Sequence, residues 1–115
     1  MNIQIFGRTS DFDTRKAVRF FKERRIDVHL MDFKQRTPSR GELRRFFQKF
    51  GAEELLDRDG KRFQALGLHA AHYGADRWLE IAEEEPDILR TPLVRNGNQL
   101  TVGLAEDTWR AWVEG

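Results

Sequence analysis

Hydrophobic and polar positions divide the first third of the chain into a strand, a helix and a second strand. Residues 3–6 form a short apolar run that Gly7 ends, which predicts the first strand. Apolar side chains between positions 17 and 25 recur at helical spacing, and residues 28–32 predict the second strand. A strand, a helix and a strand within about 30 residues form a βαβ unit, whose two strands are normally parallel.

A polar loop over residues 8–13 connects the first strand to the first helix, and it contains Asp11 and Asp13. A carboxylate at the start of a helix accepts hydrogen bonds from backbone N–H groups that have no partner within the helix. We therefore expect the side chain of one of these two residues to cap the first helix.

A second amphipathic helix begins after Pro38. Ser39 and Glu42 have the spacing of a capping box, in which each side chain bonds to the other residue's backbone N–H. Apolar residues then recur at i, i+3, i+4 and i+7 as far as Phe50, and Gly51 ends the helix.

Residues 52–85 are predicted to be entirely helical, in short pieces broken near Asp59-Gly60 and near Gly67. The last piece spans about 74–85 and ends at Pro86. Its apolar spacing predicts that three side chains are buried, namely Trp78, Ile81 and Ala82.

A β-hairpin and a helix complete the chain. The apolar pairs at 93–94 and 100–102 flank Asn96-Gly97, a typical hairpin turn, in a loop of two to four residues. A final helix is expected at about 106–113, with three apolar residues on its inner face, namely Trp109, Trp112 and Val113. The order β-α-β, helices, β-β-α is that of an α/β, thioredoxin-like fold with a four-stranded mixed sheet and a helical insertion at about 39–85.

Composition limits the chemistry that such a domain can perform. The chain has 115 residues, which predicts a single domain over 1–115, and it contains no cysteine. Disulfides, thiolate zinc sites, iron–sulfur ligation and cysteine nucleophiles are thereby excluded. No apolar run is long enough to span a membrane, and the first residues lack the pattern of a signal peptide, so we expect a cytoplasmic protein.

The near-zero net charge conceals a division along the chain. Residues 1–50 carry 13 lysines and arginines and 6 acids, whereas residues 51–115 carry 7 and 13. The basic half indicates either an acidic or nucleic-acid partner, or a compact body whose two halves complement each other in charge.

The stretch Pro86-Asp87-Ile88-Leu89-Arg90-Thr91-Pro92-Leu93-Val94 resembles a family that comprises arsenate reductase ArsC and the transcription regulator Spx. The resemblance continues through residues 99–103 and Glu106-Asp107, and covers about 2–113. Residues 14–17, Thr-Arg-Lys-Ala, are similar to the Cys-Arg-Lys-Ala with which the family begins its first helix.

The resemblance also implies where the catalytic groups should be. Overlaid without gaps, the family's nucleophilic cysteine falls on Asp11 and its second cysteine on Thr14. Reduction of arsenate needs a thiolate that attacks arsenic and then accepts electrons through a disulfide. A carboxylate and a hydroxyl do neither, so we expect no thiol redox activity.

Two oxyanion-binding arginines of the family are also replaced. Thr91 occupies the position directly before the conserved proline, which the fold implies to be cis, although Arg90 precedes it. Asp59 occupies the second arginine position, with Arg58 beside it. The ligand-binding candidates are therefore Thr9, Ser10, Asp11, Thr14, Arg58, Arg90, Thr91 and Pro92.

Basic side chains also recur along the first two helices, at Arg15, Arg19, Lys22, Arg40 and Arg44. Such rows are solvated helix faces or a surface that docks a protein partner. We do not expect direct nucleic-acid binding, because the aromatic residues in these helices follow the apolar period of a core.

His69 and His72 have the i, i+3 spacing of a two-histidine metal site. Two histidines alone are weak evidence for a metal site, and we expect no metal.

The leading hypothesis is a cysteine-free binding or regulatory module. The resemblance to Spx, which is a partner of RNA polymerase, implies a protein partner from the transcription machinery. The alternative is a glutathione-dependent reductase or transferase of the arsenate reductase type, in which bound glutathione supplies the thiol. A third possibility is a structural domain that binds no ligand where the family binds its substrate. The oligomeric state is left open.

Overall fold

The computed structural model describes all 115 residues, and the chain forms two compact units. The first combines Met1–Gln35 with Thr91–Gly115, and the second is Arg36–Arg90. A compact unit need not fold independently, so the single domain expected over 1–115 stays a prediction.

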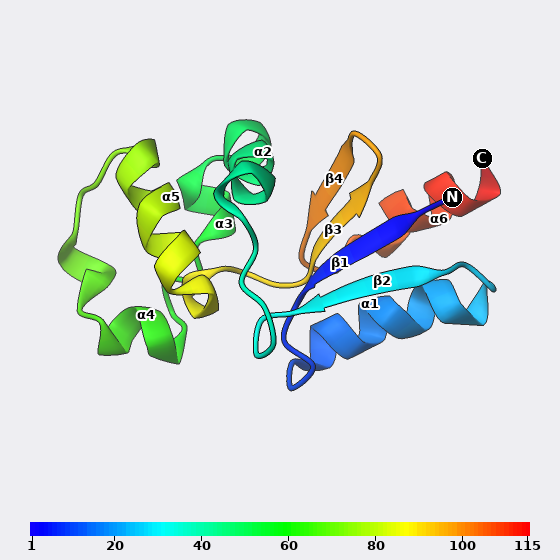
Figure 1. The fold of residues 1–115 in the computed structure, drawn as a ribbon, viewed down its shortest axis with the longest axis horizontal. Helices are drawn as coiled ribbons and strands as arrows, with labels where there is room; N and C mark the ends of the chain where they lie inside the picture. Colours follow the sequence, from blue (N-terminus) through cyan, green and yellow to red (C-terminus); the bar gives the residue numbers. More distant parts are fainter. The chain divides into compact units, whose positions relative to one another are not determined.

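The first unit contains a four-stranded mixed sheet with the strand order β2-β1-β3-β4 (Figure 1). β1 (Ile3–Gly7) pairs in parallel with β2 (Val28–Asp32) and antiparallel with β3 (Leu93–Asn96). β3 pairs antiparallel with β4 (Gln99–Val102). The α/β fold, the mixed sheet and the β-α-β … β-β-α order expected from the sequence are confirmed.

Helices α1 (Phe12–Glu23) and α6 (Glu106–Glu114) pack on one face of this sheet, in a shared buried cluster. Ile5 of β1 lies opposite Val94 of β3, and both belong to a buried cluster that includes aromatic residues of the two helices. Trp109 of α6 is fully buried at the centre of this cluster, against two phenylalanines of α1. Its indole N–H donates to the buried hydroxyl of Thr101 at 2.8 Å.

The hairpin turn is tighter than the longest loop that the sequence allowed. Asn96 pairs with Gln99, so only Gly97 and Asn98 connect the two strands. Gly97 has φ of +61°, a backbone conformation that residues with a side chain rarely adopt, which explains the glycine at this position.

The second unit begins with α2 (Arg40–Phe50), whose predicted capping box is present. The Ser39 hydroxyl accepts from the Glu42 N–H, and the Glu42 carboxylate accepts from the Ser39 N–H. Gly51 follows the helix with φ of +78°, as expected for a residue that ends it.

The segment expected to be entirely helical is only partly so. It contains α3 (Ala52–Leu55), α4 (Lys61–Ala65), the 3₁₀ turn η1 (Leu68–Ala70) and α5 (Ala75–Glu84), followed by η2 (Pro86–Ile88). The stretches between these pieces are turns and irregular backbone, at residues 56–60 and 71–74 among others. The three side chains of α5 expected to be buried are Trp78, Ile81 and Ala82, and all three are.

Backbone hydrogen bonds close the second unit by joining its middle to its end. Leu56 and Leu89 form an isolated antiparallel bridge. The N–H of Asp57 donates to the carbonyl of Ile88 at 2.8 Å, and the N–H of Arg90 donates to the carbonyl of Leu55 at 2.7 Å. No helix in either unit has the length and apolar character needed to cross a membrane.

Candidate functional site

The loop after β1 delivers Asp11 to the N-terminus of α1, but not as a side-chain cap. α1 begins at Phe12, so Asp13 already lies in its first turn, and Asp11 is the N-cap residue by backbone conformation. Neither carboxylate forms the expected capping hydrogen bond to a helix N–H. In Asp11 the reason is that the carboxylate bonds to other side chains.

Arg8 holds the Asp11 carboxylate through two of its nitrogens. Nε of Arg8 donates to Oδ1 of Asp11 at 3.1 Å, and Nη2 lies 3.0 Å from Oδ2. The pair is mostly sheltered, since the two side chains are 19% and 26% exposed. Such a two-point contact between a guanidinium and a carboxylate fixes orientation as well as charge.

Two threonine hydroxyls complete the surroundings of this carboxylate. The hydroxyl of Thr91 donates to Oδ2 of Asp11 and accepts from Nη2 of Arg8 at 3.0 Å. The hydroxyl of Thr14 lies 3.4 Å from the same Oδ2. The structure thus brings together Asp11, Thr14 and Thr91, three of the residues that the sequence named as ligand-binding candidates.

Gly7, the last residue of β1, makes room for Thr14. A Cβ atom at position 7 would lie 2.5 Å from the Thr14 hydroxyl oxygen, which is closer than such atoms approach. Thr14 is completely buried. The absence of a side chain at Gly7 is therefore what allows the first turn of α1 to pack against the end of β1.

Thr9 and Ser10 lie beside this cluster and do not join it. The Thr9 hydroxyl donates to Oδ2 of Asp32 at 3.1 Å, and the Thr9 carbonyl accepts from Arg15 at 2.9 Å. Ser10 is exposed. Thr91-Pro92 is a cis peptide, as the fold implied, and Pro92 is buried with its carbonyl accepting from the Gly103 N–H.

Arg8 is the residue that the sequence analysis missed at this site. Its partner Asp11 is only three positions away, a spacing that is visible in the sequence, whereas Thr91 is 83 positions away. Only the pairing of β1 with β3 brings the loop after β1 next to the residue before Pro92.

The cluster presents a carboxylate inside a ring of donors. A guanidinium and two hydroxyls, placed at the first turn of a helix, are the groups that bind oxyanions in proteins. Here they are already occupied by the carboxylate of Asp11. The arrangement offers no nucleophile of the thiol type, because the chain has no cysteine.

The two arginines proposed as further ligand-binding residues belong to the second unit. Arg58 donates from Nη2 to Oε1 of Glu53 at 2.8 Å. Arg90 is exposed and is the last residue of that unit. Their expected place beside Asp11 therefore stays a prediction.

The basic residues named as a partner surface also fall in different units. Arg15, Arg19 and Lys22 are exposed on α1. Arg40 of α2 forms an ion pair with Glu83 at 2.8 Å, a hydrogen bond that raises the pKa of its guanidinium. Arg44 is exposed on the same helix.

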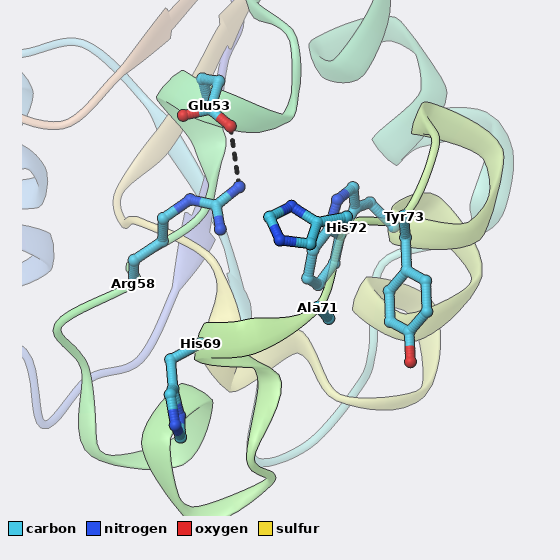
Figure 2. Close-up of a pocket in the computed structure, with 7 residues that line it drawn as sticks. Glu53, Arg58, His69, Ala71, His72 and Tyr73 are labelled. Atoms are coloured by element: carbon cyan, nitrogen blue, oxygen red, sulfur yellow. Dashed lines mark hydrogen bonds and ion pairs between the residues drawn. The ribbon is translucent and has the colours of Figure 1, made fainter.

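His69 and His72 line one pocket of the second unit, together with Arg58 (Figure 2). No group of three or more side chains of the kinds that bind metals gathers there or elsewhere in the chain.

Comparisons with known proteins agree with this architecture. The model of the ArsC family matches residues 9–112. The uncharacterized protein YusI of Bacillus subtilis is 26% identical over 97 residues, which cover 81% of this chain and 82% of YusI. The global transcriptional regulator Spx 2 of Oceanobacillus iheyensis is 26% identical over 98% of this chain and 84% of its own length.

Among solved structures, an arsenate reductase from Vibrio cholerae superimposes with a TM-score of 0.81 at 18% identity, covering 94% of each chain. At that identity the likeness shows the fold alone. The family model, by contrast, spans nearly the whole sequence, from the loop before α1 into α6. The chain therefore belongs to the ArsC family, as a divergent member without cysteine.

Proposed function

We propose that this protein is a binding module of the ArsC family that performs no thiol redox chemistry, and that its own Asp11 carboxylate fills the former anion site. The observation that carries the proposal is the ring of donors around this carboxylate, formed by Arg8, Thr14 and Thr91. The ungapped overlay puts Asp11 where the family has its nucleophilic cysteine.

The electronic requirement of arsenate reduction supports this proposal. A thiolate attacks arsenic, and the two electrons that reduce arsenic come from sulfur, which ends as a disulfide. A carboxylate has no oxidised form that corresponds to a disulfide, and the chain carries no thiol. Charge repulsion adds to this, because arsenate would have to approach a carboxylate that already uses the available donors.

The glutathione-dependent alternative meets the same obstacle. A glutathione thiolate held at the start of α1 would lie beside the Asp11 carboxylate, and like charges repel. In such a site a hydroxyl near the start of α1 would hold the glutathione thiolate. The hydroxyl of Thr9 bonds instead to Asp32, and that of Thr14 to Asp11. Thr9 and Ser10 are both exposed, and Thr14 is buried. These contacts favour the binding module over the alternative.

The exposed face of α1 is the surface that we assign to a partner. Phe12 is 66% exposed and lines a shallow hollow of about 190 Å³ with Arg15, Lys16 and Arg19. These four positions follow the i, i+3, i+4, i+7 spacing of one helix face. Three cations and one exposed aromatic ring therefore share this surface. One of the cations, Lys16, also forms an ion pair with Glu106 at 3.5 Å.

Such a surface fits an acidic protein surface that provides a small apolar recess for Phe12. Aromatic residues and arginine are enriched among the residues that contribute most to protein–protein binding, and charge complementarity steers the encounter. The relatives named global transcriptional regulators make the RNA polymerase α-subunit the first candidate, by family analogy.

The test is a titration of the ¹⁵N-labelled protein with the C-terminal domain of the RNA polymerase α-subunit from the same organism. The proposal predicts saturable shifts of α1 amides, which Phe12→Ala and Arg19→Glu each weaken by about tenfold. Arg45→Glu, on an exposed position of α2, is the matched control and leaves the affinity unchanged. Absence of saturable shifts, or equal effects of Arg19→Glu and Arg45→Glu, would remove this partner assignment.

A further inference from the structure

A second concave site lies entirely within the second unit, on residues that the proposed function does not use. It is a pocket of about 440 Å³, within the size range of sites for small molecules. The segment between η1 and α5 supplies His72 and Tyr73, and the turn after α3 supplies Arg58. Figure 2 shows the guanidinium of Arg58 and the imidazole of His72 pointing toward one another.

Arg58 is only partly satisfied by the protein. Its Nη2 donates to Glu53, whose side chain is 89% exposed, so the pair is of the solvated kind that contributes little to stability. Its Nε is buried and has no hydrogen-bond partner. Buried donors without a partner are rare in native proteins and call for an explanation.

Tyr73 and Trp78 form the aromatic part of the pocket lining, and the guanidinium of Arg58 lies near buried rings. The carbon at the centre of the Arg58 guanidinium lies 5.5 Å from the ring centroid of Trp78 and 5.6 Å from that of Phe63. Tyr73 packs edge-on against Trp78, with 5.1 Å between ring centroids, and lines the same pocket. The guanidinium is thus held against aromatic faces, a contact that fixes a cation without using its N–H donors.

From this arrangement we infer that the pocket binds a small aromatic anion, a molecule with one oxyanion group on a planar ring. The oxyanion accepts hydrogen bonds from Arg58 and His72, and the ring packs against Tyr73 and Trp78. In this structure the carboxylate of Glu53 accepts a hydrogen bond from the Arg58 guanidinium. An incoming oxyanion replaces it, and the displaced Glu53 side chain is free to move into solvent because it is already exposed.

The two histidines of the pocket have different roles in this inference. In Figure 2 the imidazole of His72 points toward Arg58, whereas that of His69 points away from the pair. Both residues are exposed, so neither substitution is expected to disturb folding. His69 therefore supplies a control within the same pocket.

The test uses phenyl phosphate and benzoate as probes and observes side-chain signals in ¹H–¹⁵N spectra of the whole protein. The indole N–H of Trp78 reports on the pocket, and that of Trp109, which is buried and bonded to Thr101 in the other unit, is the internal control. The inference predicts saturable shifts of the Trp78 indole and the Arg58 Nε–H with at least one probe, and none of the Trp109 indole.

Variants assign the binding to named groups. Arg58→Met and His72→Ala should each weaken binding by about tenfold or more, since each removes a hydrogen bond to a charged group, whereas His69→Ala leaves it unchanged. Glu53→Gln should strengthen it, because it removes the competing carboxylate. Inorganic phosphate, which lacks the ring, should bind more weakly than phenyl phosphate.

Three results would overturn the inference. The first is that neither probe shifts the Trp78 indole. The second is that His69→Ala weakens binding as much as His72→Ala does. The third is that inorganic phosphate binds as tightly as phenyl phosphate, which would show that the aromatic wall takes no part.

Discussion

The hydroxyl of Thr91 donates a hydrogen bond to the carboxylate of Asp11 across 80 positions of sequence. Arg8 donates to both residues, so the three side chains form a closed set of contacts between the end of β1, the start of α1 and the residue before Pro92. In this set Asp11 is the anion and the others are its donors. The predictions that follow test this relationship and the packing around it.

Replacing Asp11 should cost stability through the donors that it leaves behind. In Asp11→Ala the sheltered guanidinium of Arg8 loses its carboxylate, and a charged group that loses its partner costs about 1–3 kcal/mol. Asp13→Ala removes an exposed acid two positions away and should change the free energy of unfolding by less than about 0.5 kcal/mol. Urea denaturation measures both, and equal effects would show that the Asp11 contacts contribute nothing.

A cysteine placed at position 11 should be unusually acidic. In Asp11→Cys the thiolate would lie beside the Arg8 guanidinium and at the start of α1, and both favour the charged form. We expect the pKa of this thiol to fall below about 8.5, the ordinary value for cysteine. Ser10→Cys, on the exposed neighbouring position, is the control. Thiolate absorbance followed against pH gives both values, and two identical titrations would contradict the predicted role of Arg8.

The close approach of Thr14 to Gly7 predicts a coupled pair of substitutions. Gly7→Ala places a methyl group 2.5 Å from the Thr14 hydroxyl oxygen and should destabilise the fold by about 1–3 kcal/mol through overpacking. Thr14→Ala removes the clashing atoms, so the double variant should be more stable than the sum of the two single effects predicts. Strict additivity in chemical denaturation would show that the two positions do not meet.

The ion pair between Arg62 and Glu85 predicts a pH dependence of stability. Two hydrogen bonds from Arg62, at 2.8 and 2.9 Å, lower the pKa of the Glu85 carboxyl below its ordinary value of 4.5. The pair therefore stabilises the fold at pH values above 4.5, the ordinary pKa of the carboxyl. Its contribution disappears as the pH falls through the lowered pKa of Glu85 in the folded state.

Arg62→Gln should accordingly lower the midpoint of thermal unfolding slightly at pH 7 and leave it unchanged at pH values below the titration of Glu85. NMR titration of the Glu85 carboxyl in both proteins gives the pKa directly, and the value should rise in the variant. Arg45→Gln is the control, since that exposed arginine should leave the pKa of Glu85 unchanged. A pKa that is equal in wild type and Arg62→Gln would contradict the prediction.

Local patterns in the sequence were sufficient for the sheet, the capping box and the ends of most elements. The apolar run at residues 3–6, the Ser39–Glu42 spacing and the turn at Gly97 each depend on neighbouring residues, and all three features are present. The predicted breaks near Asp59-Gly60 and Gly67 are present, but the first is wider than expected and the irregular stretch at 71–74 was not predicted. Tertiary contacts such as the Leu56–Leu89 bridge override the helical spacing before Asp59.

The site was predictable in its members but not in its contacts. The resemblance to the family pointed to Asp11, Thr14 and Thr91, and the structure brings these three together. The bonding of the Asp11 carboxylate was assigned to a helix cap, because capping is the local explanation for an acid at that position. Arg8 was not identified, since its contact with Thr91 arises only when β1 and β3 pair.

The central claim is that the Asp11 carboxylate occupies the site that would otherwise hold an anion. The most direct measurement follows the amide signals of Arg8, Asp11 and Thr91 while arsenate, and separately reduced glutathione, is added to the ¹⁵N-labelled wild type and to Asp11→Ala. The account predicts no saturable shifts in the wild type with either compound, and local saturable shifts with arsenate in the variant. Saturable shifts of these amides in the wild type would contradict it.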